Sequence, residues 1–274
     1  MTEQVETVPT QAQTEEGMTL MEHLGELRGR LFKAVIALLV GTAVGMVFSE
    51  RLLQFIIMPY GETLMVTAPT EGITNVFVVS LTLGAALAMP VIVYQILAFV
   101  MPGLLPNERK WIYFSVPAAT GLFVLGAAFA WFVMLPTAIG FLTNVYPSVF
   151  KYDLKPDEYV PFITGVVFWI GVAFEMPLII FVLAKANVIS ARALAKQWRF
   201  AIVIIAVIAA LITPTPDPIN MSVVMTPLLL LYVLSIGMAS VARRGKTTPA
   251  LIDSFEDEDR KKPQGDGAKN GAKK

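Results

Sequence analysis

The sequence contains no cysteine and only one histidine, His23, among its 274 residues. Disulfide bonds, thiol catalysis and metal sites built from cysteines or from a histidine cluster are therefore excluded. Charge is also scarce, because only 15% of the residues are charged, whereas soluble domains carry about 25%. The hydrophobic fraction is 55% and the mean hydropathy is +0.66. This composition indicates an integral membrane protein.

The N-terminus lacks the pattern of a secretory signal peptide, which needs a basic start followed by an apolar stretch. Residues 1–26 instead contain six glutamates and no lysine or arginine. We therefore expect residues 1–17 to form a flexible acidic tail and the first membrane helix to direct insertion.

Apolar runs indicate six membrane helices, since about 20 helical residues cross the roughly 30 Å of hydrocarbon in a bilayer. The predicted spans are Leu31–Phe48, Phe77–Val100, Trp111–Leu135, Phe162–Ala184, Phe200–Ile212 and Met221–Val241. The fifth run has 13 residues and rises only about 20 Å at 1.5 Å per residue. The prediction is an all-α polytopic domain over residues 18–245 with a truncated fifth helix.

The distribution of lysine and arginine predicts the orientation, because cytoplasmic flanks and short loops are enriched in them. One set of segments holds Arg28, Arg30, Lys33, Arg109, Lys110, Lys185, Arg192, Lys196, Arg199 and nine more in the C-terminal tail. The opposite set holds only Arg51, Lys151 and Lys155. Both termini are therefore predicted to be cytoplasmic, and the loops 49–76, 136–161 and 213–220 to be external.

Two segments outside the spans have distinct characters. Residues 50–59 read as a short amphipathic helix closed by Pro59, and we expect the external loops to form a cap. Residues 246–274 mix acidic and basic residues with glycine, which cannot bury enough apolar surface to fold. That tail is predicted to be disordered.

Glu175 is the only acidic residue within the predicted spans. A charge at mid-bilayer costs roughly 2.5–3.5 kcal/mol on insertion scales, so such a residue usually faces a partner, water or a ligand. It lies two residues before Pro177, one of four prolines expected to kink the spans, the others being Pro90, Pro117 and Pro227. A protonated glutamate bonded to a neighbouring helix is the structural alternative to a functional, hydrated site.

Two motifs lie at the predicted cytoplasmic surface. Residues 23–30, His-Leu-Gly-Glu-Leu-Arg-Gly-Arg, lie on a helical apolar repeat that leads into the first span. Glu26 and Arg30 are four residues apart and could simply pair with each other. Residues 99–110 form a loop with two prolines and a glycine, in which Glu108 follows Asn107, a favourable N-cap for the third span. Capping alone would explain an isolated glutamate there.

These motifs carry a family resemblance. Residues 23–30, 94–99, 102–109, 171–177 and 213–217 together resemble TatC, the multi-spanning subunit of the twin-arginine protein translocase, in order from about Met18 to Arg244. The resemblance implies a glove-like six-helix bundle with short fifth and sixth helices. It implies that the protein binds twin-arginine signal peptides and exports folded proteins across a bacterial inner membrane by the proton-motive force.

The resemblance also assigns roles to individual residues. Glu108 and Glu26 are implied to bind the arginine pair, with Phe99 in the apolar floor and Arg28 orienting Glu26. Carboxylates suit this task because they accept the planar guanidinium fork in bidentate fashion. Pro59 and Asp217 match positions in the external cap, and Glu175 matches an intramembrane acid that holds water or contacts a partner helix.

Partners and departures follow from the same resemblance. The implied partners are small single-span subunits of the TatA and TatB type along helices five and six, further copies of the chain within a larger complex, and the bilayer. No cofactor, metal or nucleic acid is expected. Trp131, Ala210 and Met221 depart from residues common in the family, so the partner contacts are predicted as regions only.

Three other function classes remain as alternatives. A proton-coupled transporter could use Glu175, but it should usually show repeat symmetry and more polar groups near that residue, and neither is visible in the sequence. A scaffold without cargo recognition would be insensitive to Glu26 and Glu108. An enzyme is disfavoured because the sequence has no zinc motif, nucleophile elbow or phosphate loop.

Overall fold

In a computed structural model, residues 20–58, 66, 68–100, 110–143, 155–213 and 218–243 are described. The terminal segments 1–17 and 246–274, which we predicted to be tails, lie outside the described residues. The helices are α1 (Leu20–Ile57), α2 (Pro69–Val100), α3 (Lys110–Phe129), a π-helical turn (Ala130–Met134), α4 (Leu135–Thr143), α5 (Pro156–Phe174), α6 (Met176–Lys185), α7 (Ala191–Lys196), α8 (Trp198–Ile212) and α9 (Pro218–Ala242).

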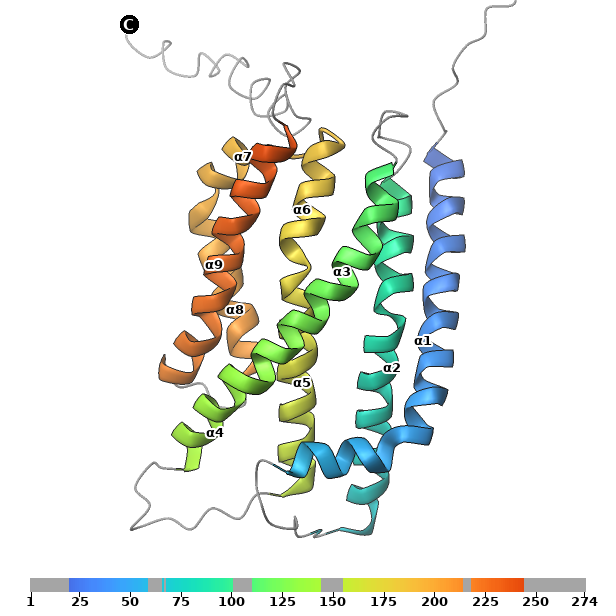
Figure 1. Ribbon diagram of the computed structural model, residues 1–274, viewed down its shortest axis with the longest axis vertical. Coiled ribbons are helices and arrows are strands. Elements are labelled where there is room, and N and C mark those ends of the chain that lie inside the picture. The colour runs from blue at the N-terminus through green and yellow to red at the C-terminus, as the bar shows by residue number, and fades with distance from the viewer. Residues whose placement is uncertain are drawn as a thin grey trace, which may run out of the picture.

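The helices pack together in one bundle, which the chain crosses six times (Figure 1). α1 and α2 run side by side, α6 continues the line of α5, and α3 crosses the bundle obliquely towards α9. The start of α1 and the end of α9 lie at the same end of the bundle, which is the upper end in Figure 1. The predicted all-α fold with six membrane helices is confirmed.

Hydropathy supports membrane insertion of this bundle. Within the described residues, five helical segments are long and apolar enough to cross a membrane, and Trp198–Ile212 is a shorter apolar helix. With 15 residues α8 rises about 22 Å, less than the bilayer core, as the sequence predicted. α9 has 25 residues and is therefore long enough to span, although it is shorter than α1 and α2.

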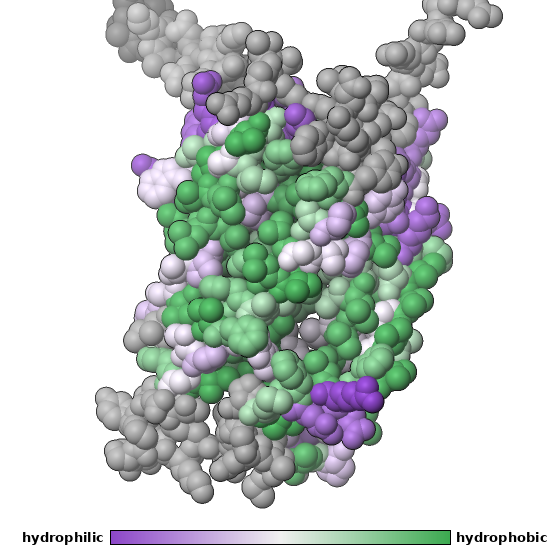
Figure 2. All heavy atoms as spheres, in the orientation of Figure 1, coloured by the Kyte–Doolittle hydropathy of each residue, from purple (hydrophilic) through white to green (hydrophobic). Residues whose placement is uncertain are grey.

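Figure 2 shows a hydrophobic band across the middle of the visible face and hydrophilic residues toward its two ends. The basic residues of the described helices gather at the upper end, at the start of α1, α3 and α8 and around the end of α6 and α9. The lower end carries two basic residues, Arg51 and Lys155, in the described chain. This uneven distribution of basic residues between the two ends is the observation from which we predicted the orientation.

The predicted amphipathic helix at residues 50–59 is the continuation of α1. α1 turns at its C-terminal part and runs across the lower end of the bundle (Figure 1). There the Phe55 ring stacks on Trp131 with 4.3 Å between the centroids. The Tyr159 hydroxyl donates a hydrogen bond to the Ile56 carbonyl at 3.1 Å. These contacts fix the lower end of α1 to the π-helical turn and to α5.

The third span differs from its predicted bounds. We expected it to end at Leu135, but helical structure continues through Ala130–Met134 and α4 to Thr143. The segment begins as an α-helix and changes to a π-helical turn, a rare form that inserts one extra residue into the turn. The predicted span ended just before Pro136, whereas the apolar helix continues past that proline, and the segment that is apolar enough to cross a membrane is Phe114–Phe141.

The four prolines that we expected to kink the spans occupy two kinds of position, inside a continuous helix or directly after a break. Pro90, Pro117 and Pro227 lie inside α2, α3 and α9, which continue through them. Pro177 is the second residue of α6 and follows a break in the helix. Its position there agrees with the preference of proline for the first turn, where a missing N–H is not needed.

Small residues bring α1 and α2 into backbone contact. A methyl group added to Gly41 would overlap the Gly84 carbonyl, and one added to Gly45 would overlap the Ser80 carbonyl. Gly41 and Gly45, like Ser80 and Gly84, are four residues apart and face the partner helix. This is the small-xxx-small packing of membrane helices, in which small residues let two backbones approach closely.

We expect Gly84→Val to destabilise the fold, because the added side chain must displace the Thr42 backbone, which a Cβ at position 84 would already overlap. Overpacking of this kind costs about 1–3 kcal/mol or more. Thermal unfolding of the purified protein in detergent measures the effect. Gly121→Val is the matched control, because nothing lies within 4 Å of a Cβ at that helical glycine. An equal loss of thermal stability in both variants would contradict the packing role.

Candidate functional site

The first candidate site lies at the upper end of α1, where Glu26 and Arg30 form an ion pair. Arg30 donates to Glu26 Oε1 from Nε at 2.9 Å and also from Nη2. The two side chains are 22% and 24% exposed, for Arg30 and Glu26 respectively, so the pair is partly shielded from solvent. The structure therefore confirms the i,i+4 pairing that the sequence offered as the simple interpretation.

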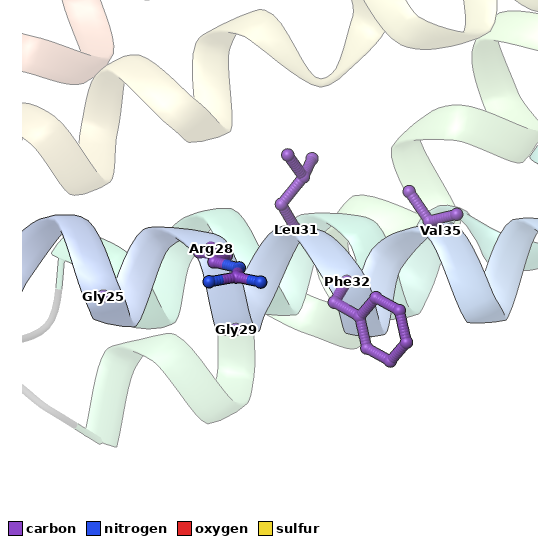
Figure 3. Close-up of a pocket in the computed structure, with 6 residues that line it drawn as sticks. All are labelled: Gly25, Arg28, Gly29, Leu31, Phe32 and Val35. Atoms are coloured by element: carbon purple, nitrogen blue, oxygen red, sulfur yellow. The ribbon is translucent and has the colours of Figure 1, made fainter.

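A groove of about 550 Å³ runs along the same part of α1 (Figure 3). The described residues that line it are Gly25, Arg28, Gly29, Leu31, Phe32 and Val35. Leu31 and Val35 project to one side of α1 and Phe32 to the other. The two glycines leave the helix backbone uncovered between the side chains, since no described atom lies within 4 Å of a Cβ built on either. The groove combines a guanidinium, bare backbone and apolar walls.

The packing of α1 on α2 determines which residues share this end. The contacts Gly41 to Gly84 and Gly45 to Ser80 define an antiparallel register in which paired residue numbers add up to 125. Because both helices rise 1.5 Å per residue, continuing this register brings Phe99 to the level of Glu26. Phe99 is the penultimate residue of α2 and is partly buried. Three of the four predicted peptide-binding residues, Glu26, Arg28 and Phe99, therefore lie at one end of the α1 and α2 pair.

The remaining predicted residues of the recognition site and the cap cannot be placed in the same way. Glu108 belongs to the segment 101–109 that joins α2 to α3, and this segment lies outside the described residues. Pro59 and Asp217 also lie outside them.

Glu175 forms a second, separate site at the junction of α5 and α6. It is 2% exposed, and its Oε1 is buried and accepts no hydrogen bond among the described residues. Its amide bonds to the Val172 carbonyl at 3.0 Å, which closes α5, while its carbonyl accepts from Leu178 and Ile179, which opens α6. The acid is thus the single residue between two helical segments, in the middle of the bundle and away from Glu26 (Figure 1).

Two glycine contacts hold this junction against α3. A Cβ at Gly126 would lie 2.7 Å from the Phe174 ring, and a Cβ at Gly171 would lie 2.7 Å from the Phe123 ring. Each helix therefore inserts a phenylalanine over a glycine of the other. Phe174 immediately precedes Glu175, so this reciprocal packing fixes the backbone at the acid.

Sequence reasoning missed a second buried polar residue. Asn75 in α2 is 3% exposed, and neither its Nδ2 nor its Oδ1 has a hydrogen-bond partner among the described residues. It lies one helical turn after Glu71, which is also buried. The signal was available, since Thr74-Asn75 interrupts an apolar helix, but the predicted span began at Phe77 and therefore excluded it.

Comparisons with known proteins agree on one family. The family model described as Sec-independent protein translocase protein (TatC) matches residues 22–227. A Helicobacter pylori protein named Sec-independent protein translocase protein TatC is 35% identical over 87% of this chain and 93% of its own length. The Aquifex aeolicus protein of the same name is 37% identical over 84% and 98%. The crystal structure of a twin-arginine translocase receptor, TatC, superimposes with a TM-score of 0.74 at 36% identity and covers 81% of this chain and all of that one.

We expect Glu175→Met to stabilise the fold, because it replaces a buried carboxyl oxygen that has no donor with an apolar group of similar length. Relief of an unsatisfied buried group is worth about 1–3 kcal/mol, and 1 kcal/mol corresponds to about 2–4 °C in Tm for a chain of 150–250 residues. Thermal unfolding in detergent tests this. Glu158→Met, at an exposed glutamate of α5, is the control and should leave Tm near the wild-type value. A fall in Tm for Glu175→Met would mean that the carboxyl group is bound to a partner.

Proposed function

The chain belongs to the TatC family of Sec-independent protein translocases, and from this membership we propose that it is the receptor subunit that binds twin-arginine signal peptides. It exports folded proteins across the bacterial inner membrane at the expense of the proton-motive force. The observation that supports this function best is the partly buried Glu26 carboxylate at the upper end of α1.

Peptide recognition uses the upper end of α1 and α2. The Glu26 carboxylate and that of Glu108 accept the guanidinium groups of the two adjacent arginines, and a lysine ammonium cannot reproduce this forked geometry. An exposed ion pair contributes only about 0.2–1 kcal/mol, so further affinity must come from apolar contact. Leu31, Phe32 and Val35 in the groove, with Phe99 at the level of Glu26, supply that surface for the apolar stretch of the peptide.

The upper end of the bundle faces the cytoplasm. Support comes from the concentration of lysine and arginine at that end, because positive residues are retained on the cytoplasmic side. Both termini are then cytoplasmic, and signal peptides meet the groove before export. The lower end, with the turned part of α1 stacked on Trp131, faces outward as the cap.

The small single-span partner subunits of the TatA and TatB type bind along α8 and α9, and the working form contains several copies of the chain. Support comes from the outer face of α8, where Phe200, Val203 and Leu211 are 71%, 62% and 81% exposed. A helix that is too short to cross the bilayer by itself leaves a thinned region beside it. A neighbouring apolar helix can fill this region.

Glu175 holds water in the membrane interior beside these partners, or contacts a polar residue of a partner helix. Support comes from its buried oxygen without a donor and from the helix break at its position. An intramembrane carboxyl group without a bonded partner is costly, and water or a partner group reduces that cost.

We expect Glu108→Gln combined with Glu26→Gln to abolish export of a folded reporter with a twin-arginine signal, because both acceptors of guanidinium charge are lost. Site-specific photocrosslinking from position 108 to the signal peptide should succeed in the wild-type chain. Glu22→Gln, one turn before Glu26, is the control for lost negative charge. Normal export by the double variant would exclude this recognition site.

We expect Glu175→Ala to reduce or abolish export while signal-peptide binding persists, because the two sites are separate in the fold. Export in cells and crosslinking of the peptide to position 108 measure the two properties independently. If Glu175→Ala lost both, the residue would be structural and the proposed hydration role would be wrong.

A further inference from the structure

The Glu26 and Arg30 pair has the same chemistry as the contact proposed between Glu26 and a signal peptide. Both hydrogen bonds that the structure gives Arg30 end on Glu26 Oε1. A guanidinium of the chain therefore already lies on the carboxylate that is proposed to receive a guanidinium of the cargo. An incoming arginine that binds Glu26 through both carboxylate oxygens must compete with Arg30 for Oε1.

A second observation comes from α2. The Gln95 side chain has its Oε1 buried, and this oxygen accepts no hydrogen bond among the described residues. A buried acceptor without a donor is destabilising, so Gln95 is prepared to receive an N–H group.

The packing of the two helices places Gln95 opposite Arg30. Arg30 lies eleven residues before Gly41, and Gln95 lies eleven residues after Gly84, the glycines at the backbone contact. Eleven residues are about three turns, so each side chain is on the same face of its helix as its glycine. The antiparallel register also puts both at one level, because 30 and 95 again add up to 125. The Arg30 side chain thus has an acceptor on its own helix, and the register places a second buried acceptor, Gln95 Oε1, at the same level on the facing helix.

We propose that Arg30 is an internal competitor for the Glu26 carboxylate, and that Gln95 Oε1 accepts the Arg30 guanidinium when a signal-peptide arginine takes its place on Glu26. This inference rests on the proposed function. In the free protein the pair keeps Glu26 neutralised in its partly buried position. In the bound state one guanidinium replaces another, and the displaced group satisfies a buried acceptor.

The exchange has a consequence for specificity. A cargo lysine would have to displace a forked guanidinium with a point charge, which forms weaker and less directional contacts with a carboxylate. The internal arginine therefore lowers the affinity for peptides that lack arginine more than it lowers the affinity for peptides that carry it. Without Arg30, the chain should bind all basic peptides more readily and discriminate less.

The alternative is that the pair only stabilises the first turns of α1, as i,i+4 pairs do. The two explanations predict opposite results. A competitor weakens peptide binding, so its removal strengthens binding. A residue that merely positions Glu26 assists binding, so its removal weakens it.

The test measures the dissociation constant of a fluorescent twin-arginine signal peptide for the full chain in lipid nanodiscs. Arg30→Gln should bind about two- to fivefold tighter, the range expected from loss of a partly exposed ion pair. Gln95→Leu should bind weaker by a similar factor, because the displaced Arg30 has no second acceptor. The double variant should behave like Arg30→Gln, since Gln95 acts only through Arg30. Lys33→Gln controls for the removal of a positive charge near a basic peptide, and the gain for Arg30→Gln must exceed it.

The outcomes separate this inference from the function on which it rests. If the wild-type chain does not bind the peptide, or if Glu26→Gln binds it equally well, the proposed recognition role of Glu26 fails. If wild type and Glu26→Gln behave as proposed but Arg30→Gln binds equally or more weakly, only the competitor role is overturned. Equal affinities of Gln95→Leu and wild type, or a double variant that resembles Gln95→Leu, would overturn the role of Gln95.

Discussion

The backbone contact between α1 and α2 is the constraint on which the recognition end depends. At Gly41 and Gly84 no side chain fits between the helices, so their spacing and their register are set by main-chain atoms. The register then continues three to four turns towards the upper end, where it brings Arg30 opposite Gln95 and Glu26 level with Phe99. The geometry of the proposed recognition site, which is assembled from α1 and α2, is therefore set by glycines that have no functional side chain.

A second principle of the structure is that the Glu26 and Arg30 ion pair and the buried acid Glu175 are kept apart. The ion pair of Glu26 and Arg30 lies at the end of the bundle, where charged groups remain near water. Glu175 lies in the apolar middle, where the interlocked pairs of Gly126 with Phe174 and Gly171 with Phe123 hold the backbone. A signal peptide bound at the proposed recognition site would therefore lie away from the buried acid. Coupling between the two must pass through α2, α3 and the junction of α5 with α6, which are packed on one another.

Much of the fold could be predicted from sequence because the bilayer permits few solutions. Apolar length alone identified six helices and the short α8, and Pro177 marked the break beside Glu175. Hydropathy did not give the helix ends. α1 continues past Phe48 into a segment that contains charged residues, and the third span continues past Leu135 through α4, which is as apolar as α3. The π-helical turn, in which Trp131 stacks on Phe55, could not be predicted from hydropathy either.

The site could be predicted in part only. Glu26, Arg28 and Phe99 were identified through a family resemblance, and their grouping at one end follows from helix register, which composition does not encode. The spacing of Gly41 with Gly45 and of Ser80 with Gly84 was a readable signal for that register. Gln95 could not be recognised, because a polar residue in an apolar helix becomes informative only when its burial and its lack of a partner are known. Asn75 was missed for a different reason, since the predicted span began at Phe77.

The central claim is that carboxylates at the upper end of α1 and α2 read guanidinium groups by their forked geometry. The most direct measurement compares the dissociation constants of two signal peptides for the purified full chain in nanodiscs, identical except that both arginines are replaced by lysines. The account predicts that the lysine peptide binds at least several-fold more weakly, although its charge is the same. Equal affinities would show that only positive charge is recognised and would contradict the account.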